Sequence, residues 1–358
     1  MVYNPDMDRN YSIELLKKLS LAFGPSGYEE EVKDIILSEL ESLTCDVEVD
    51  RIGNIVATFG RGEDAHTILY SAHQDEIGFI VNEITADGFL KMWNIGGWST
   101  LTIPSSAILI RTQSGVDRYG VFGQISPHFL KKGEAPTVPH LEDLFVDVGA
   151  KTKDEVINVL GINVGDVAVP YTEFVYIPET GIAMSKAFDD RVGVAALLDL
   201  AREISSKNML PKNNVKIAFT VQEEVGIRGA DVLSRYVDAD TCIVVEGAPA
   251  DDMPSNPAES QTGVRRGAHV RIFDPTHIAS PGLLRKLRAV AKENAIVTQE
   301  AIRHGGGTDA CYLSRACYGM ETIVTGVPTR YAHCHNSVIS IDDYEELVKL
   351  LAAAAYGL

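Results

Sequence analysis

An apolar pair leads into two adjacent carboxylates in Lys186-Ala187-Phe188-Asp189-Asp190-Arg191-Val192-Gly193. A helical pattern follows at once, because apolar residues recur every three or four positions at Val194, Leu197, Leu198, Ala201 and Ile204. Two acids at the mouth of a buried helix cost desolvation free energy unless positive groups neutralise them. We expect Arg191 to neutralise one of these acids and a divalent metal ion to bind the other. Asp189 would then bridge two metal ions. An ordinary helix cap beside an arginine is the alternative interpretation.

The chain has 358 residues and the composition of an ordinary soluble globular protein, with 45% hydrophobic and 23% charged residues. Its length predicts about two or three structural units. A net charge of -18 without a basic stretch argues against a nucleic-acid partner. We expect no membrane span and no signal peptide, since no apolar run is long enough. Reduced thiols in a cytoplasm are indicated by five scattered cysteines without a Cys-x-x-Cys pair: Cys45, Cys242, Cys311, Cys317 and Cys334.

Strands alternate with helices in residues 1–76 and 167–358, which predicts a layered α/β domain. Strands are predicted at 67–72, 215–221, 241–245 and 322–324, and helices after the capping-box pattern at 26–29, after Asp190, from Ser280-Pro281 and near 340–343. Residues 77–166 differ. Short β-like runs at 79–84, 107–111 and 120–125 alternate there with Gly, Pro and Ser turns. We therefore predict a catalytic α/β domain that is interrupted by a small β-rich insert.

Loops after strand ends usually carry the ligand groups of α/β proteins, so partners for Asp189 are expected there. The candidates are His73, with Asp75 placed to hold its imidazole in one tautomer, Glu223 and Glu224 after the strand at 215–221, Glu246 closing the strand at 242–245, and His333 after the apolar run at 322–324. This mixture of carboxylates and imidazoles suits Zn²⁺, and Co²⁺ or Mn²⁺ would also fit.

Each candidate has a simpler interpretation when it is taken alone. His73 and Asp75 could form a hydrogen-bonded pair without metal, and Glu223-Glu224 could be a solvated loop. The complete set favours a metal centre over these separate explanations. Four other histidines have no such setting and are expected to be surface or hydrogen-bonded groups: His66, His140, His269 and His277.

Two metal ions that share a water lower its pKa and polarise a carbonyl, and the water then needs a base that is not itself a ligand. Glu223 and Glu224 supply one base and one ligand if the backbone leaves strand geometry, since a regular strand would point them to opposite faces. Gly226 just beyond them fits such a bend.

Five segments in order carry a resemblance: His73-x-Asp75-Glu76-Ile77-Gly78, Ala187-Phe188-Asp189-Asp190-Arg191, Gln222-Glu223-Glu224-Val225-Gly226, Gly306-Gly307-Thr308-Asp309-Ala310 and Arg330-Tyr331-Ala332-His333. The set resembles the M42 family of dinuclear metallo-aminopeptidases, which build tetrahedral dodecamers and include glutamyl, leucyl and deblocking types. The match runs nearly end to end and also includes residues 23–28, 127–128 and 161–166.

The resemblance implies which residues bind each of the two metal ions. Asp189 would bridge the ions, His73 and Glu246 would complete one site, and Glu224 and His333 the other. Glu223 would be the general base with Asp75 behind His73. The family also implies a cis peptide between Asp189 and Asp190, an inserted dimerisation domain of barrel-like β structure at residues 77–166, and dimers that assemble to a dodecamer.

Three features depart from the family pattern or have no assigned role. Glu246 stands where many members have aspartate, and a longer carboxylate can still coordinate a metal. The ligand role goes to His333, which leaves His335 unassigned. The loop Gly305-Gly306-Gly307-Thr308-Asp309 resembles a phosphate cradle but lacks the lysine of a P-loop, so we expect it to line the active cleft.

We predict a cytoplasmic metal-dependent aminopeptidase that removes N-terminal residues from short peptides. A metal-bridged hydroxide would attack the first peptide carbonyl, and Glu223 would relay its proton to the leaving amine. Two alternatives are a metal-independent endo-β-glucanase, which needs two carboxylates flanking the bond, and a non-catalytic assembly protein. The preferred N-terminal residue, the native metal and the choice between dimer and dodecamer are not decided by the sequence.

Overall fold

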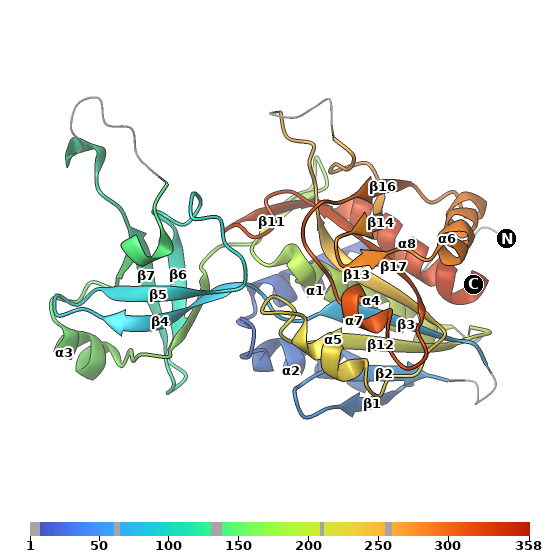
Figure 1. The fold of residues 1–358 in the computed structure, drawn as a ribbon, viewed down its shortest axis with the longest axis horizontal. Coiled ribbons are helices and arrows are strands. Elements are labelled where there is room, and N and C mark those ends of the chain that lie inside the picture. Colours follow the sequence, from blue (N-terminus) through green and yellow to red (C-terminus); the bar gives the residue numbers. More distant parts are fainter. Residues whose placement is uncertain (1–7, 61–64, 130–137, 208–210, 255–259) are drawn as a thin grey trace.

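The computed structural model describes residues 8–60, 65–129, 138–207, 211–254 and 260–358. A layered α/β body and a smaller β-barrel lie side by side, and the chain passes from the body to the barrel and back again (Figure 1). Among the described residues, no helix combines the length and the apolar character that crossing a bilayer requires. All five cysteines are free thiols.

The body is built on a nine-stranded sheet. Its strand order is β1 (Asp46–Val49), β2 (Ile55–Phe59), β12 (Asn214–Thr220), β3 (Thr67–His73), β13 (Thr241–Pro249), β17 (Glu321–Thr329), β14 (Ala268–Asp274) and β15 (His277–Ile278), with β16 (Thr298–Ile302) paired to β14. The four central strands from β12 to β17 are parallel. Their carboxyl ends therefore meet at one edge of the sheet. The predicted strands at 67–72, 215–221, 241–245 and 322–324 are confirmed, although β13 and β17 extend several residues further.

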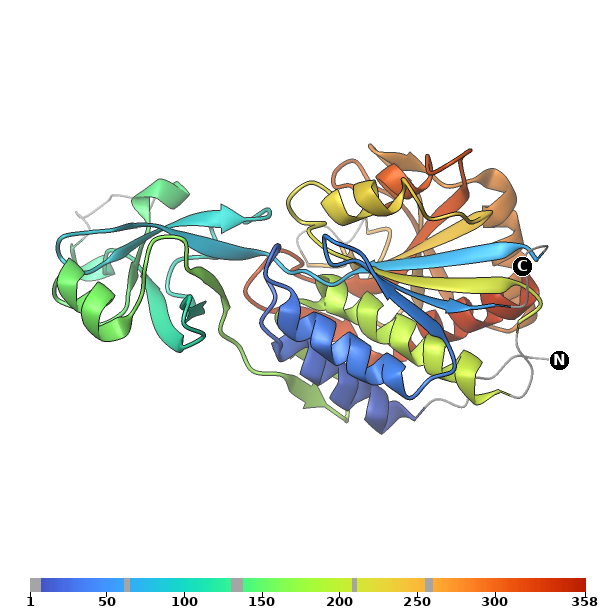
Figure 2. The same cartoon turned by 90° about the horizontal axis from the view of Figure 1, so that it is seen from below.

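Helices cover both faces of the sheet (Figure 2). One face carries the larger hydrophobic core and is covered by α1 (Arg9–Leu21), α2 (Glu30–Glu41), α4 (Phe188–Ser206), α6 (Pro281–Glu293) and α8 (Ile341–Gly357). The other face carries a smaller core with α5 (Arg228–Leu233) and α7 (Ala310–Leu313). The predicted helix starts at Ser280 and Ser340 are confirmed, since Pro281 opens α6 and the Ser340 hydroxyl accepts a hydrogen bond from the Asp343 N–H.

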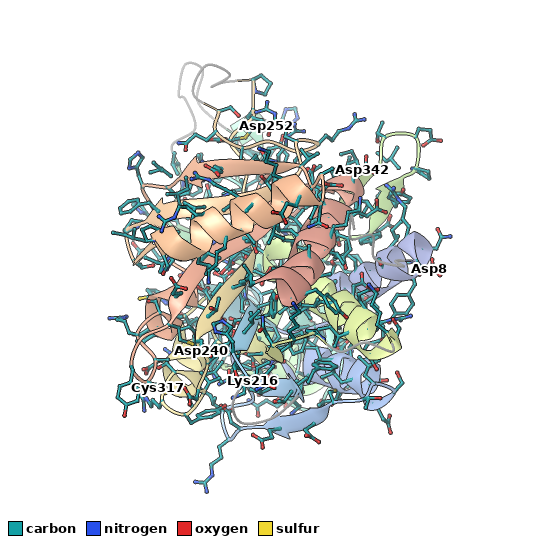
Figure 3. The ribbon with its side chains drawn as sticks, turned by 90° about the vertical axis from the view of Figure 1, so that its right-hand side faces the viewer. Asp8, Lys216, Asp240, Asp252, Cys317 and Asp342 are labelled. Carbon is teal, nitrogen blue, oxygen red and sulfur yellow. The ribbon has the colours of Figure 1, made fainter. Side chains whose placement is uncertain are left out.

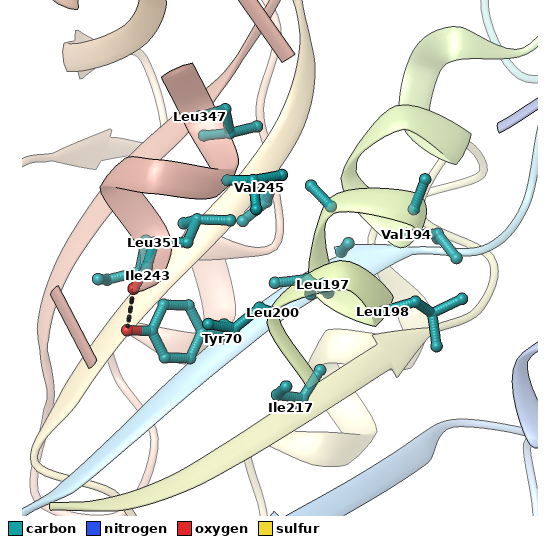
Figure 4. Packing of buried hydrophobic residues seen from close by; sticks show 14 of the residues in the cluster. Tyr70, Val194, Leu197, Leu198, Leu200, Ile217, Ile243, Val245, Leu347 and Leu351 are labelled. Atoms are coloured by element: carbon teal, nitrogen blue, oxygen red, sulfur yellow. Dashed lines mark hydrogen bonds between the residues drawn. The ribbon is translucent and has the colours of Figure 1, made fainter. Parts of the chain in front are cut away.

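Tyr70 shows how the larger core is closed (Figure 4). Its ring is fully buried between α4 and α8, and its hydroxyl donates a hydrogen bond of 3.0 Å to the Leu351 carbonyl. Leu197 and Leu200 of α4 pack beside it, which is the helical spacing that the sequence showed. Helix α4 is thus held firmly against the sheet, and its first residues are fixed with it.

The capping-box prediction at residues 26–29 is wrong, although the helix that it announced is present. Helix α2 begins at Glu30 and has no side-chain cap. Ser26 donates its hydroxyl hydrogen to Asp75 at 2.6 Å instead, and Glu29 accepts the N–H of Gly27 at 2.7 Å. A long-range partner, Asp75, has taken the hydroxyl that local spacing assigned to the helix.

The barrel is a closed sheet of six strands in the order β4 (Gly78–Ile84), β5 (Leu90–Ile95), β8 (Phe145–Asp147), β7 (Asp117–Gly123), β6 (Ala107–Arg111) and β9 (Val167–Pro170). Its interior holds Phe79, whose ring lies 4.6 Å from Trp98 and 4.8 Å from Phe122 between centroids. The fold class, a layered α/β fold with an inserted barrel, is confirmed. Strand β7 lies earlier than the predicted 120–125, because Asp117 pairs with Arg111 on β6.

The division of the chain into domains at residues 76 and 166 stays a prediction, as does the dimerisation role of the insert. The barrel includes β9, which follows the expected boundary at 166. The remaining short elements are α3 (Lys153–Glu155) with one π turn (Val156–Leu160), two 3-10 turns (Pro127–Phe129 and Leu141–Asp143), and a small sheet of β10 (Val175–Ile177), β11 (Ile182–Ser185) and β18 (Ser337–Ser340).

The two edges of the central sheet differ in what they display. At the amino ends of the parallel strands, Asp240 accepts the N–H of Thr67 at 2.8 Å, and Lys216 lies close to Asp240 (Figure 3). These groups lie where the parallel strands begin. The opposite edge, at the carboxyl ends, carries the residues described next.

Candidate metal centre

The five predicted ligand residues come together at the carboxyl edge of the central strands. His73 is the last residue of β3, Glu246 lies in β13, and Asp189 lies in the first turn of α4. Glu224 follows β12, and His333 follows β17. Glu246 was expected to close its strand, but β13 continues to Pro249, so its carboxylate leaves from within the strand.

Asp189 lies between the two histidines. Its Oδ1 is 3.2 Å from His73 Nε2, and its Oδ2 is 3.5 Å from His333 Nε2. Each histidine also faces a glutamate: His73 Nε2 lies 3.8 Å from Glu246, and His333 Nε2 lies 3.5 Å from Glu224. Two groups of three side chains therefore share one carboxylate. A bridging carboxylate between two cations has this arrangement.

The backbone around Asp189 is held in an unusual path. Ala187 has a left-handed φ of 57°, and the peptide between Asp189 and Asp190 is cis, as the resemblance implied. Strand β13 approaches this turn closely at Gly247. A Cβ at that position would lie 2.6 Å from the Phe188 carbonyl oxygen and 2.7 Å from the Asp189 Cα. A glycine is required there because any side chain would push the turn off the strand.

Asp190 and Arg191 do not behave as predicted. Asp190 faces the backbone and accepts the N–H groups of His73 at 3.2 Å and Gly193 at 3.0 Å. Arg191 neutralises neither aspartate. Its guanidinium instead lies 3.3 Å from Glu76, and Lys186 contacts the same carboxylate at 2.6 Å. Asp190, His73 and Glu246 also form a compact group, but both oxygens of Asp190 already have backbone partners.

Asp75 holds His73 from behind. The Nδ1 atom of His73 lies 3.2 Å from the Asp75 carbonyl oxygen and 3.4 Å from its carboxylate. The Asp75 carboxylate also accepts the Ser26 hydroxyl at 2.6 Å and the N–H groups of Glu223 at 2.9 Å and Glu224 at 3.2 Å. Burial opposes the ionised form, but the hydrogen bonds from His73 and Ser26 outweigh it and lower the pKa of Asp75. One buried carboxylate thus orients His73 and the loop after β12 together.

The loop after β12 leaves strand geometry as the sequence required. Gln222 has φ 54° and Gly226 has φ 113°, so Glu223 and Glu224 both face the cavity. Burial raises the pKa of Glu224 to about 7, and the neighbouring Asp189 adds to this effect. Burial also raises the pKa of Glu223 well above its ordinary value, with the charge of Glu224 contributing.

His333 is held by the barrel. Its Nδ1 lies 2.8 Å from the carbonyl oxygen of Gly97, in the segment after β5. Burial lowers the pKa of His333, but the hydrogen bond with Asp189 and the charge of Glu224 outweigh this and raise it to about 10. The contact with Gly97 could not be found from the sequence, because a backbone carbonyl leaves no residue-type signal. His335 lies in the same loop and remains without an assigned role.

The donor set fits divalent cations. Burial raises the pKa of Glu246 well above its ordinary value, and the adjacent Asp190 and Asp189 reinforce it. Buried carboxylates that repel one another in this way are stabilised by a bound cation. Each group of three offers two or three oxygen atoms and one imidazole nitrogen, the ligand types that Zn²⁺, Co²⁺ and Mn²⁺ accept.

A cavity of about 390 Å³ opens over the site. Gly305, Gly306 and Gly307 line it, so the expectation that this loop lines the cleft is confirmed. The cavity is also lined by Arg271 of β14 and by Arg303, just after β16, and no motif in the sequence pointed to either arginine.

His269 of β14 also differs from expectation, since it is fully buried. Neither of its ring nitrogens has a hydrogen-bond partner among the described residues. Burial, followed by the charges of Arg271 and Arg303, lowers its pKa well below the ordinary value, which favours the neutral ring.

Comparisons with known proteins agree with this geometry. The model of a family described as M42 glutamyl aminopeptidase matches residues 53–350. A glutamyl aminopeptidase of Lactococcus lactis subsp. cremoris is 32% identical over 345 residues, which cover 96% of this chain and 95% of the relative. A lysyl aminopeptidase of Pyrococcus furiosus is 30% identical over 344 residues, which cover 95% of each chain.

Solved structures give the same result. A TET aminopeptidase from a marine sediment Thaumarchaeota archaeon superimposes with a TM-score of 0.92 at 34% identity, covering 98% of this chain and 97% of that one. The TET1 peptidase of Pyrococcus horikoshii, which can assemble into a tetrahedron or a large octahedral shell, gives a TM-score of 0.85 at 32% identity. That match covers 97% of this chain and 100% of the other.

Proposed function

This chain belongs to the M42 peptidase family and is an aminopeptidase, and we propose that it removes N-terminal residues from short peptides with two divalent metal ions. The observation that carries the proposal is the position of Asp189, whose two oxygens each face a different histidine. His73, Glu246 and Asp189 would hold one ion, and His333, Glu224 and Asp189 the other. Zn²⁺ suits these ligands best, with Co²⁺ or Mn²⁺ as alternatives.

Two bound divalent ions would lower the pKa of a water and polarise the peptide carbonyl. Glu223 would act as the general base, because it faces the cavity and is not needed as a ligand. It would take a proton from the attacking water and give it to the leaving amine. Burial raises the pKa of Glu223 above its ordinary value, which makes its carboxylate a stronger base.

Asp75 would act as a positioning residue. It orients the His73 ring from Nδ1 and anchors the backbone N–H of Glu223, so the ligand and the base keep a fixed relation. The carboxylates at the cavity also suit the free amine of a peptide, which would restrict cleavage to the first residue.

We also propose a homo-oligomer, with dimers formed through the barrel and assembly up to a dodecamer. Large apolar side chains exposed on the barrel support this, among them Trp93, Leu101, Ile125 and Phe129. A cytoplasmic location is proposed from the five free cysteines.

Glu223→Gln tests the chemistry directly. The variant should fold and bind two ions per subunit, while kcat on aminoacyl substrates falls roughly 10²- to 10⁴-fold because the base is lost. Metal content and kcat are measured on the same sample. Glu48→Gln, on the exposed strand β1, is the matched control and should keep full activity.

Most activity retained in Glu223→Gln with full metal content would refute the role of Glu223. A chelator should abolish wild-type hydrolysis and metal addition should restore it. Hydrolysis of aminoacyl substrates that survives the chelator would refute the proposed metal dependence, and a metal-independent glycosidase would instead cleave β-glucan in the presence of chelator.

A further inference from the structure

Two arginines share the cavity with the candidate metal centre. Arg271 and Arg303 line the same cavity as Asp189 and Glu224. They come from adjacent positions, because β14 pairs with β16 and the Arg303 N–H donates to the Phe273 carbonyl at 2.8 Å. Two positive groups therefore stand next to the place where a peptide N-terminus would be cleaved.

The two guanidinium groups differ in burial and in hydrogen bonding. Arg271 is buried and Arg303 is partly buried, and Arg303 Nη2 also donates to the Pro249 carbonyl oxygen at 2.9 Å and to the Thr262 hydroxyl. The side chain of Arg271 is 6% exposed and that of Arg303 is 14% exposed. The Nε atom of each is buried and has no hydrogen-bond partner among the residues that the structure describes. Buried donors in proteins are normally satisfied. The Nε atoms are buried, so the donors that a ligand could reach are those of the Nη groups, and for Arg271 these make one hydrogen bond among the described residues, to Asp274. An acceptor on a ligand could satisfy the others.

The carboxylates that face these arginines do not face the cavity. Arg271 Nη1 lies 3.4 Å from Asp274, which is fully buried and also accepts the N–H groups of Thr276 at 2.8 Å and His277 at 3.0 Å. Arg303 Nη1 lies 2.9 Å from Asp251. Neither aspartate lines the cavity, whereas both arginines do. The aspartates orient the guanidinium groups, and the cavity presents positive charge.

The rest of the cavity leaves room for a side chain. Ile227 and Pro249 form an apolar part of the cavity wall. Gly305 and Gly306 also line the cavity and have no Cβ atom that would fill it. The acids of the cavity are accounted for by the proposed metal ions, by the general base and by the free amine of the substrate. The remaining polar side chains that line this cavity are Arg271, Arg303 and His304, and the two arginines are cationic.

We infer that Arg271 and Arg303 bind the side-chain carboxylate of an N-terminal glutamate or aspartate, and so make this enzyme selective for acidic N-terminal residues. This inference rests on the proposed aminopeptidase function. A guanidinium group matches a carboxylate with two parallel hydrogen bonds, which gives both affinity and orientation. An N-terminal lysine would place its ammonium against two buried cations and is rejected for that reason.

The experiment compares kcat/KM of the metal-loaded enzyme on glutamyl, aspartyl, leucyl and lysyl p-nitroanilides. The wild type should prefer the two acidic substrates over the other two. Arg271→Met should lower the glutamyl-to-leucyl ratio by about 10- to 100-fold, the effect of losing hydrogen bonds to a charged group. Arg271→Lys should have a glutamyl-to-leucyl ratio between those of the wild type and Arg271→Met, because it keeps the positive charge and loses the planar guanidinium group. Arg288→Met, which removes a surface pair with Glu300, is the control and should leave the ratio unchanged.

Two results would overturn the inference: a wild type that prefers leucyl or lysyl substrate, or an Arg271→Met variant in which all four substrates lose activity equally. If Arg271→Met does not fold, Arg303→Gln and competition by free L-glutamate against L-lysine in leucyl hydrolysis carry the same test. Glutamate should then inhibit the wild type more strongly than lysine. Failure of the aminopeptidase proposal looks different, since metal-loaded wild type would turn over none of the four substrates.

Discussion

The two histidines of the candidate centre are held in opposite ways. His73 ends a central strand, its side chain is 2% exposed, and its Nδ1 faces the buried carboxylate of Asp75. His333 lies in a loop with φ 58°, its side chain is 41% exposed, and its Nδ1 faces a carbonyl of the barrel. One half of the centre is built into the sheet, and the other half depends on a loop and on the barrel.

The two halves of the centre should therefore differ in metal affinity and in their dependence on the barrel. A ligand on a strand with a buried hydrogen-bond partner is preorganised, so the His73 half should bind its ion more tightly. The His333 half is completed by Gly97, which belongs to the inserted unit. Any displacement of the barrel relative to the sheet would move His333 before it moved His73.

The largest difference is expected between His73→Ala and His333→Ala. Both variants should lose hydrolysis, but only His73→Ala should also destabilise the metal-free fold, by about 1–3 kcal/mol, because it removes the imidazole that contacts the buried Asp75 carboxylate. His333→Ala should stay within about 0.5 kcal/mol of the wild type, since its side chain is partly exposed.

Urea unfolding in the presence of chelator measures this pair, because bound metal would otherwise add its own stabilisation. Equal unfolding free energies for the two variants would remove the distinction between the strand-built and loop-built halves.

Glu29 allows the stability of the region around His73 and Asp75 to be probed by a change of pH. Burial and the charge of Asp75 raise its pKa from 4.5 to about 7, and its carboxylate accepts the N–H of Gln222 at 3.2 Å. Because the folded pKa is raised, the stability that Glu29 contributes is present below pH 4.5 and is lost as the pH rises through about 7. Glu29→Gln should therefore become more stable than the wild type over that window, by about 1–2 kcal/mol at its upper end.

The measurement is the difference in unfolding free energy between variant and wild type from pH 4.5 to 8 (the window bracketing the shift), so that other titrating groups cancel. A difference that does not change with pH would show that burial and the charge of Asp75 do not raise the pKa of Glu29 in the folded protein.

The smallest effect is expected for Gly97→Ala. A Cβ there would lie 3.2 Å from the Nδ1 of His333, so the imidazole must shift by a few tenths of an ångström. The affinity of the His333 half should fall by less than about tenfold while the His73 half stays unchanged. Metal titration of the variant measures both sites, and an equal weakening of the two would contradict the assignment of Gly97 to one half.

The main elements of the site could be predicted from the sequence because they depend on one simple property of parallel sheets. Parallel strands end at one edge, so acids and histidines just after apolar runs were expected to converge there. His73, Asp189, Glu224, Glu246 and His333 do converge, and the bend after β12 was foreseen from Gly226. Their roles as ligands remain predictions.

The parts that were missed depend on long-range partners. Arg191 was assigned to its sequence neighbours, but Glu76 lies closer to it in the fold. Ser26 was read as a local cap, whereas Asp75 takes its hydroxyl. Arg271 was invisible as a cavity residue, because an arginine within a strand gives no indication of which face it occupies until the neighbouring strands are placed.

The claim on which the account depends is that Asp189 bridges two ions, and anomalous X-ray diffraction from zinc-loaded crystals tests it most directly. We predict two anomalous peaks on either side of Asp189, one beside His73 and Glu246 and one beside His333 and Glu224. The account would be contradicted by a single peak at saturating zinc, or by peaks that contact Asp190 and leave Asp189 without a metal.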